Sequence, residues 1–158
     1  MERELHWSTP EETQAFGRRL GALLRAGDLI VLSGDLGAGK TTLTQGIGEG
    51  LGVRGPITSP TFVIARVHPS LVGGPGLVHV DAYRLGSVVE LDDLDLDADL
   101  DDSVTIVEWG AGLSEQLSEQ RLEISLTGED VRTAHLVGVG SRWDDVLASL
   151  SDDAVGIP

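Results

Sequence analysis

The amino-acid sequence predicts a single α/β domain organised around one phosphate-binding loop. Two kinds of observation favour this class of fold. The first is a glycine-rich stretch at 34–42 that lies between a continuous apolar run and a segment with helical character. Two later apolar runs, at 77–80 and 104–107, each lead into an acidic residue. Such runs are typical of parallel strands buried on both faces, and the ends of such strands meet at the sheet edge where α/β proteins bind ligands.

The length and composition fit one domain of ordinary size. The chain has 158 residues, and we expect the domain to occupy 1–150, followed by a flexible tail at 151–158. It contains no cysteine, which excludes disulfides, thiolate catalysis and cysteine-ligated zinc. The first residues lack the pattern of a signal peptide, and no apolar run reaches the length of a membrane span. We therefore expect a cytoplasmic protein without membrane contact.

The charge balance argues against strong direct binding of nucleic acid. The formal net charge is -15 and the pI is near 4.4. Such a chain repels a phosphate backbone unless a local basic patch opposes the repulsion, and no arginine cluster in the sequence provides one. The expected partners are therefore proteins and a nucleotide.

The N-terminal elements are a short strand at 4–7 and a capped helix. Thr9 is the predicted N-cap, with Pro10 at the first helical position and Glu12 completing a capping box. Gly27 is expected to end this helix. Its apolar residues recur at the helical period and predict packing on the sheet; they are Phe16, Leu20, Leu23 and Leu24.

Residues 34–42 match the phosphate-loop pattern G-x-x-x-x-G-K-[ST] at every fixed position. In such a loop, backbone N–H groups and the following helix N-terminus surround phosphate oxygens, and the lysine reaches the β and γ phosphates. Lys40 is the one lysine among eleven basic residues, at a position that needs a compact charge on a flexible stem. With 21 glycines, chance easily satisfies the glycine positions but not the lysine and threonine. The predicted nucleotide-binding residues are Asp35, Leu36, Gly37, Ala38, Gly39, Lys40, Thr41 and Thr42.

The segment after the loop reads as a helix at 41–47 that Gly52 stops. Gly46, Gly48 and Gly50 each weaken it by about 1 kcal/mol relative to alanine. We expect this helix to depend on tertiary packing.

Ser59 and Thr61 come just before the next predicted strand, at 63–67. They have two interpretations. One is a switch loop whose hydroxyl senses the γ phosphate through the metal. The other is a plain turn, because Ser-Pro-Thr is common turn chemistry. The spacing favours neither.

Asp81 and Glu108 follow the apolar runs at 77–80 and 104–107, and they are candidates for holding Mg²⁺, which takes oxygen ligands. One acid can hold the metal while the other coordinates it too or orients the attacking water. Spacing alone does not assign these roles. The alternative is that either acid is only an N-cap for the following helix.

Two neighbours of these acids have interpretations based on packing. We expect His79 to point away from Asp81 by strand alternation and to serve packing rather than ligation. Trp109 directly follows Glu108 and so lies at the edge of the site, although tryptophan more often packs than takes part in chemistry.

The C-terminal part is predicted to form strands and a helix that serve the fold rather than the site. Strands are predicted at 121–126 and 134–139, and a final helix at 141–150. Arg132 lies between the two strands, where it either reaches a nucleotide or faces solvent. The residues alone favour solvent.

Four motifs in this order and spacing resemble the TsaE family. They are G-D-L-G-A-G-K-T-T at 34–42, S-P-T-F at 59–62, H-V-D-A-Y-R at 79–84 and V-E-W at 107–109. TsaE proteins are small bacterial ATPases of tRNA threonylcarbamoyladenosine (t6A) biosynthesis, and the similarity covers nearly the whole chain. The resemblance implies the P-loop NTPase fold, with a mainly parallel central sheet flanked by helices.

The resemblance also implies roles for the site residues. ATP would bind the loop, with Thr41 and Glu108 at Mg²⁺ and Asp81 near the phosphates and the metal. Lys40, Asp81 and Glu108 would be the catalytic residues. The family pattern brings Arg132 to the nucleotide, in place of the solvent position favoured above.

Further expectations rest on the same resemblance. The face at 13–16 would lie near the adenine, and Thr61, with Ser59, would be the switch. The chain departs from the family pattern at Ala111, where the family often has an acid. The remaining site candidates are Tyr83, Arg84 and Trp109.

The family implies a purpose as well. TsaE-like proteins act with TsaB and TsaD, and their ATP hydrolysis resets the complex between rounds of modifying adenosine 37 of tRNA. We expect this chain to be a Mg²⁺-dependent ATPase that is weak without these partners. The alternatives are a small P-loop kinase and a nucleotide-sensing adaptor without enzymatic activity. A GTPase switch is disfavoured because the chain has no asparagine for an Asn-Lys-x-Asp base-reading motif.

Overall fold

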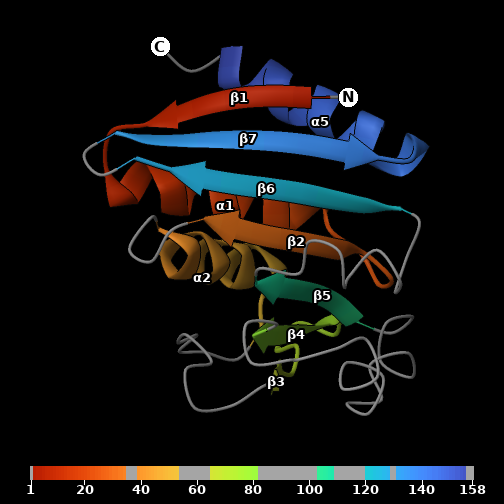
Figure 1. The fold of residues 1–158 in the computed structure, drawn as a ribbon. Coiled ribbons are helices and arrows are strands. Elements are labelled where there is room, and N and C mark those ends of the chain that lie inside the picture. Colours follow the sequence, from red (N-terminus) through yellow and green to blue (C-terminus); the bar gives the residue numbers. More distant parts are fainter. Residues whose placement is uncertain are drawn as a thin grey trace.

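The computed structural model describes residues 2–34, 39–53, 65–81, 103–108, 120–128 and 131–155. Its centre is a seven-stranded sheet in the order β1-β7-β6-β2-β5-β4-β3 (Figure 1). The strand that feeds the predicted phosphate loop, β2, lies in the middle of this order. The elements along the chain are β1 (Glu2–Trp7), α1 (Pro10–Leu23), β2 (Leu29–Gly34), α2 (Lys40–Leu51), β3 (Ala65–His68), β4 (Gly76–Asp81), β5 (Ser103–Glu108), β6 (Arg121–Thr127), β7 (Arg132–Val139) and α5 (Ser141–Val155).

The sheet is mixed rather than mainly parallel, which corrects the expectation from the sequence. β2 pairs in parallel with β5 and β6, and β4 pairs in parallel with β5. β1 with β7, β6 with β7 and β3 with β4 are antiparallel. The connections 69–75 and 128–131 are too short for a crossover helix, so the strands that they join must be antiparallel. The parallel part is confined to the centre, where the site is predicted.

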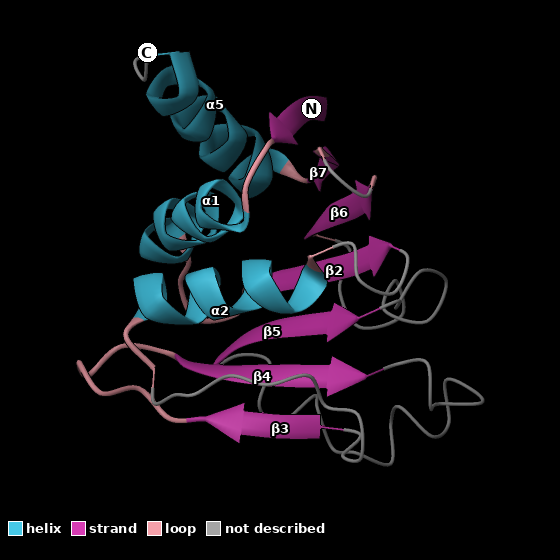
Figure 2. Cartoon of the chain, turned by 90° about the vertical axis from the view of Figure 1, so that its left-hand side faces the viewer, coloured by secondary structure: helices cyan, strands magenta, loops and turns pink. Residues whose placement is uncertain are grey.

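The described helices all lie on one face of the sheet, as the edge-on view in Figure 2 shows for α1, α2 and α5. The core fills the space between these helices and the strands. Alternate residues of β6 point into it, namely Leu122, Ile124 and Leu126. The last helix, α5, contributes Trp143, Val146, Leu147 and Leu150.

The start of α1 forms as the sequence predicts. Thr9 is the N-cap, and its Oγ1 accepts a hydrogen bond from the backbone N–H of Glu12 at 3.2 Å. The Glu12 carboxylate accepts in return from the N–H of Ser8, one residue before the cap. The helix ends at Leu23, and Gly27 lies in the turn that leads to β2, at φ 93°.

The helices α1 and α2 touch backbone to backbone. A Cβ added to Gly46 would lie 2.3 Å from the carbonyl oxygen of Gln14, and one added to Gly50 would lie 2.2 Å from that of Arg18. Cβ atoms on Gly17 and Gly21 would meet the backbone of α2 at 2.7 Å and 2.3 Å. The expectation that α2 depends on tertiary packing is thereby explained, because the glycines that weaken the isolated helix permit this contact.

The C-terminal end of α2 is also set by glycine. Gly52 adopts the left-handed conformation at φ 76° and ends the helix, and its N–H bonds the carbonyls of Gly48 and Glu49. The predicted stop at this residue is confirmed.

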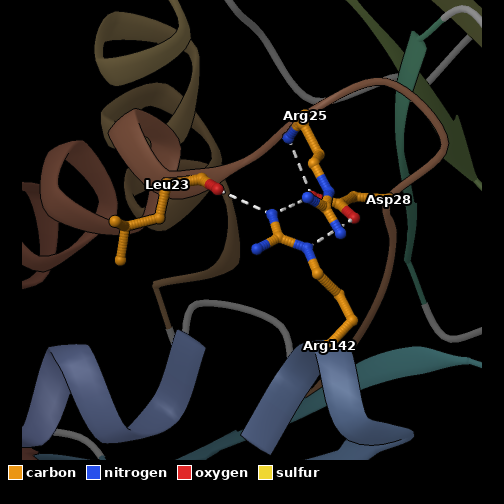
Figure 3. A network of polar contacts seen from close by, with 4 residues as sticks. All are labelled: Leu23, Arg25, Asp28 and Arg142. Atoms are coloured by element: carbon orange, nitrogen blue, oxygen red, sulfur yellow. Dashed lines mark hydrogen bonds and ion pairs between the residues drawn. The ribbon is translucent and has the colours of Figure 1, made fainter. Parts of the chain in front are cut away.

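A buried ion pair joins α5 to the turn between α1 and β2 (Figure 3). Nη2 of Arg142 donates to Oδ2 of Asp28 at 2.8 Å and to the carbonyl of Leu23 at 2.7 Å, while Nε contacts Oδ1 at 3.3 Å. Asp28 also accepts from the N–H of Arg25. The side chain of Asp28 is only 7% exposed, so this pairing removes the penalty of a lone buried charge.

The C-terminal helix is longer than predicted. It continues to Val155, so residues 151–155 belong to α5 instead of the tail in which the sequence placed them. No helix in the described ranges is long and apolar enough to cross a membrane.

Candidate functional site

The end of β2 and the start of α2 bracket the predicted phosphate loop. β2 ends at Gly34 and α2 begins at Lys40, so the strand–loop–helix context that a phosphate loop requires is present. Gly39 is the N-cap of α2 at φ 100°, a left-handed conformation in which an L side chain is strained. The glycine that the phosphate-loop pattern requires before the lysine therefore has a conformational reason.

The N-terminus of α2 differs from that of α1 in a way that suits an anion. Thr9 caps α1, and Glu11 and Glu12 lie in its first turn. By contrast, the described residues supply no side-chain cap to α2, and its first turn has no acid. A helix leaves its first N–H groups without partners inside the helix and carries partial positive charge at that end. The start of α2 is thus chemically prepared to bind phosphate.

The first turn of α2 is ordered by its own bonds. The N–H of Leu43 donates to the carbonyl of Gly39 at 2.9 Å, and Oγ1 of Thr44 donates to the carbonyl of Lys40 at 2.9 Å. Thr44 is fully buried, whereas Lys40 and Thr41 are partly exposed. The two residues predicted to contact phosphate and metal therefore start an anchored helix and remain accessible.

The two acid-ended strands lie next to each other and next to β2. Asp81 and Glu108 are direct partners in the parallel register of β4 and β5, and Glu108 is also the register partner of Leu32 in β2. Both acids therefore end their strands at the sheet edge from which the phosphate loop leaves. Glu108 is 5% exposed; the side chain of Asp81 lies outside the described part of the structure.

His79 lies against Glu108, which the sequence interpretation missed. Its Nε2 is 3.3 Å from Oε1 of Glu108, and its ring is fully buried. Its burial confirms the predicted packing role. The prediction that His79 points away from Asp81 was wrong, because residues two apart on a strand face the same side of the sheet. The spacing in the sequence could have indicated this contact, because His79 lies two residues before Asp81, and Asp81 pairs with Glu108.

Arg132 is the first residue of β7 and lies beside Gly39, at the end of the predicted phosphate loop. A Cβ added to Gly39 would be 3.8 Å from Nε of Arg132. The guanidinium also donates from Nη1 to the carbonyl of Gly128, which holds it at this edge of the sheet. Arg132 is partly exposed at this position, and its contact with a nucleotide stays a prediction.

The residues at this edge fit a magnesium ion in their chemistry. The side chain of Glu108 is only 7% exposed, and its Oε1 has no hydrogen-bond partner in the described part of the chain. A buried carboxylate is costly unless it is paired, and a cation bound to either of its oxygens offsets that cost. Within the same ranges no three His, Asp or Glu side chains cluster around one metal position. The predicted ligand set of Thr41, Glu108 and Asp81 stays a prediction.

The expected adenine face consists partly of core residues. Thr13 and Phe16 are each 1% exposed, and Phe16 packs on Trp7 with ring centroids 4.9 Å apart. The position of an adenine near this face stays a prediction. The remaining predicted site residues lie outside the described ranges; they are Asp35, Leu36, Gly37, Ala38, Ser59, Thr61, Tyr83, Arg84 and Trp109.

Comparison with known proteins decides the family. Residues 7–135 match the family model described as "Threonylcarbamoyl adenosine biosynthesis protein TsaE". The chain belongs to the TsaE family. A relative from Streptomyces coelicolor, named tRNA threonylcarbamoyladenosine biosynthesis protein TsaE, is 63% identical over 134 residues, which are 80% of this chain and 90% of the relative. The TsaE protein of Bacillus subtilis is 40% identical over 154 residues, covering 94% of this chain and 95% of that protein.

A solved structure supports the fold of this TsaE family member. The crystal structure of YdiB from Bacillus subtilis superposes with a TM-score of 0.76 at 35% sequence identity, covering 98% of each chain. The resemblance stated from the four motifs is therefore confirmed at the level of the family, and the fold is a single α/β domain whose sheet is mixed.

Proposed function

We propose that this chain is the ATP-binding and ATP-hydrolysing component of tRNA threonylcarbamoyladenosine synthesis. The observation that carries the proposal is the uncapped N-terminus of α2, which starts with Lys40, beside two neighbouring strands that end in Asp81 and Glu108. A phosphate cradle next to paired acids is the arrangement that P-loop enzymes use for nucleotide hydrolysis. Membership of the TsaE family supplies the biological process.

Each residue of the site has a task in this proposal. The N–H groups at the start of α2 and the ammonium of Lys40 bind the phosphates of ATP and oppose the charge that develops during transfer. Glu108, Asp81 and the hydroxyl of Thr41 would hold Mg²⁺, which would supply positive charge to oppose that of the phosphates. Arg132, beside Gly39, adds a second cation to the phosphate side.

The proposed partners are TsaB and TsaD. The net charge of -15 favours docking on protein over direct binding of a tRNA backbone, because the chain would repel the phosphates. Ser59 and Thr61 are proposed as the switch that senses the γ phosphate. Modification of tRNA would then be carried out by the assembled complex, and ATP hydrolysis by this chain would reset that complex between rounds.

The test is Lys40→Ala, assayed by binding of a fluorescent ATP analogue and by phosphate release with and without TsaB and TsaD. We expect loss of binding and turnover, with an unchanged circular dichroism spectrum. Arg18→Ala is the matched control, since Arg18 pairs with Glu49 at 3.1 Å on the exposed side of the helix pair and such a pair contributes little to stability. Unchanged nucleotide affinity of Lys40→Ala would refute the phosphate-loop assignment.

The same assay separates the alternatives. Transfer of phosphate to a third molecule would indicate a small kinase. Nucleotide binding without turnover, in the presence and absence of partners, would indicate a sensing adaptor.

A further inference from the structure

The buried pair of His79 and Glu108 has a feature that packing alone does not explain. Both groups are polar, both are at least nine-tenths buried, and Nε2 of His79 lies 3.3 Å from Oε1 of Glu108. An aliphatic side chain would fill the same space without bringing a hydrogen-bond donor to a carboxylate. We propose that His79 is a positioning residue that holds Oε1 of Glu108 and leaves Oε2 for the magnesium of the bound nucleotide. This inference rests on the function proposed above.

The position of the ring is fixed by the sheet. His79 is the register partner of Ile106 in β5 and of Arg66 in β3, so it lies in the interior of the sheet with a paired strand on each side. Leu77, two residues earlier on the same strand, and Ile106 are fully buried members of the core under the helices. Among the residues whose side chains the structure describes, the ring lies beside buried apolar neighbours and reaches the carboxylate of Glu108.

The carboxylate needs such a neighbour. Moving a carboxylate out of water is costly unless it is paired or hydrogen-bonded. In the described part of the chain, neither ring nitrogen of His79 nor Oε1 of Glu108 has a hydrogen-bond partner. The approach of Nε2 to Oε1 at 3.3 Å therefore brings two unsatisfied buried groups together, and a small rotation of the ring would complete a hydrogen bond between them. The tautomer with hydrogen on Nε2 is the one that lets a neutral ring donate to Oε1.

Holding one oxygen fixes the direction of the other. The two oxygens of a carboxylate are rigidly linked, so a donor on Oε1 limits rotation about the last side-chain bond and orients Oε2. Donors behind a metal-binding group commonly act in this way, and their removal lowers metal affinity or activity by about 10- to 100-fold. His79 adjoins Glu108 from the side of β4, the strand that also ends in Asp81.

The test measures metal affinity without relying on turnover. Mn²⁺ replaces Mg²⁺ as a spin probe, and its affinity for the full-length chain is measured by electron paramagnetic resonance in the presence of ADP. ADP affinity is measured separately in EDTA. Three variants are compared: His79→Leu removes the donor, His79→Gln places an amide nitrogen near the position of Nε2, and His79→Asn places it near Nδ1.

We expect His79→Leu to weaken Mn²⁺ binding by about 10- to 100-fold, with metal-free ADP affinity preserved. His79→Gln should restore most of the Mn²⁺ affinity, and His79→Asn should not. In turnover assays with TsaB and TsaD, the same order should appear in kcat rather than in KM for ATP. Thermal unfolding of each variant reports stability, and if His79→Leu does not fold, the comparison of His79→Gln with His79→Asn carries the test.

Two results overturn the inference. One is wild-type Mn²⁺ affinity in His79→Leu, and the other is equal loss in the Gln and Asn variants. Failure of the proposed function looks different, because then the wild-type chain itself would not bind Mn²⁺ with ADP, and this inference would fall with it. Wild-type binding that Lys40→Ala abolishes and His79→Leu leaves unchanged would refute the role of His79 alone.

Discussion

Gly46→Ala sets two physical effects against each other in the helix that follows the phosphate loop. Helix propensity predicts that alanine stabilises α2, whereas the contact with α1 predicts the opposite. The added Cβ would lie 2.3 Å from the carbonyl oxygen of Gln14 and 3.0 Å from its carbonyl carbon. Since carbon–oxygen contacts in proteins are about 3.3 Å or longer, the two helices would have to separate by about 1 Å.

The magnitude follows from these distances. Overpacking a core costs about 1–3 kcal/mol, and the upper end applies here because the obstructing atoms are backbone and cannot rotate away. Alanine recovers about 1 kcal/mol through helix propensity. The expected net loss in free energy of unfolding is about 2 kcal/mol, and the melting temperature of a chain of this size should fall by about 4–8 °C.

Urea unfolding followed by far-ultraviolet circular dichroism measures this change. Gly74→Ala is the control, since its nearest neighbour is Ser70 Oγ at 3.9 Å and its backbone is not left-handed. This control should be neutral or slightly stabilised. If Gly46→Ala is as stable as the wild-type chain or more so, the contact between α1 and α2 is not what requires glycine there, and the reasoning fails.

Three further predictions concern the site and its support. Glu108→Ala should impair phosphate release with TsaB and TsaD while ATP binding is less affected; a normal rate would remove Glu108 from the chemistry. Arg132→Gln should weaken ATP binding by about 1 kcal/mol, or about fivefold, because the lost cation is partly exposed, and calorimetric titration against wild type checks this. Arg142→Ala should lower the free energy of unfolding by about 3 kcal/mol, because Asp28 stays buried without its guanidinium, and should leave ATP affinity unchanged. Arg142→Lys should recover only part of that loss, since a lysine cannot form the bidentate pair; full recovery would show that charge alone suffices.

Local signals in the sequence predict the elements well. The Thr9 cap, the left-handed Gly52 stop and the apolar runs of β2, β4 and β5 each reflect interactions within a few residues, and such interactions are visible in one sequence. The direction of the outer strands was missed because it depends on which strands become neighbours. The pairing of strands is a tertiary property, and in the sequence it was indicated only by the short connections at 69–75 and 128–131.

In the site, too, the features set by local sequence were predicted and those set by tertiary structure were missed. The phosphate loop and the two acids were predicted because motif and strand end coincide in the sequence. The register that brings Asp81 opposite Glu108, and His79 within 3.3 Å of Glu108, is set between strands that are far apart in the chain. The position of Arg132 beside Gly39 likewise needed the order of β7, β6 and β2 in the sheet.

Elements from the N-terminal and C-terminal parts of the chain contact each other in the fold. β1 pairs with β7, and Arg142 bonds Asp28 and Leu23 across sequence separations of 114 and 119 residues. During synthesis the N-terminal strand and helix therefore leave the ribosome long before their partners exist. Loops of this length also slow folding, because their closure entropy is lost before the contacts form. A nascent chain that stops short of Arg142 lacks both the guanidinium that pairs with Asp28 and the apolar residues that α5 contributes to the core, so the packing is complete only when the last helix has been made.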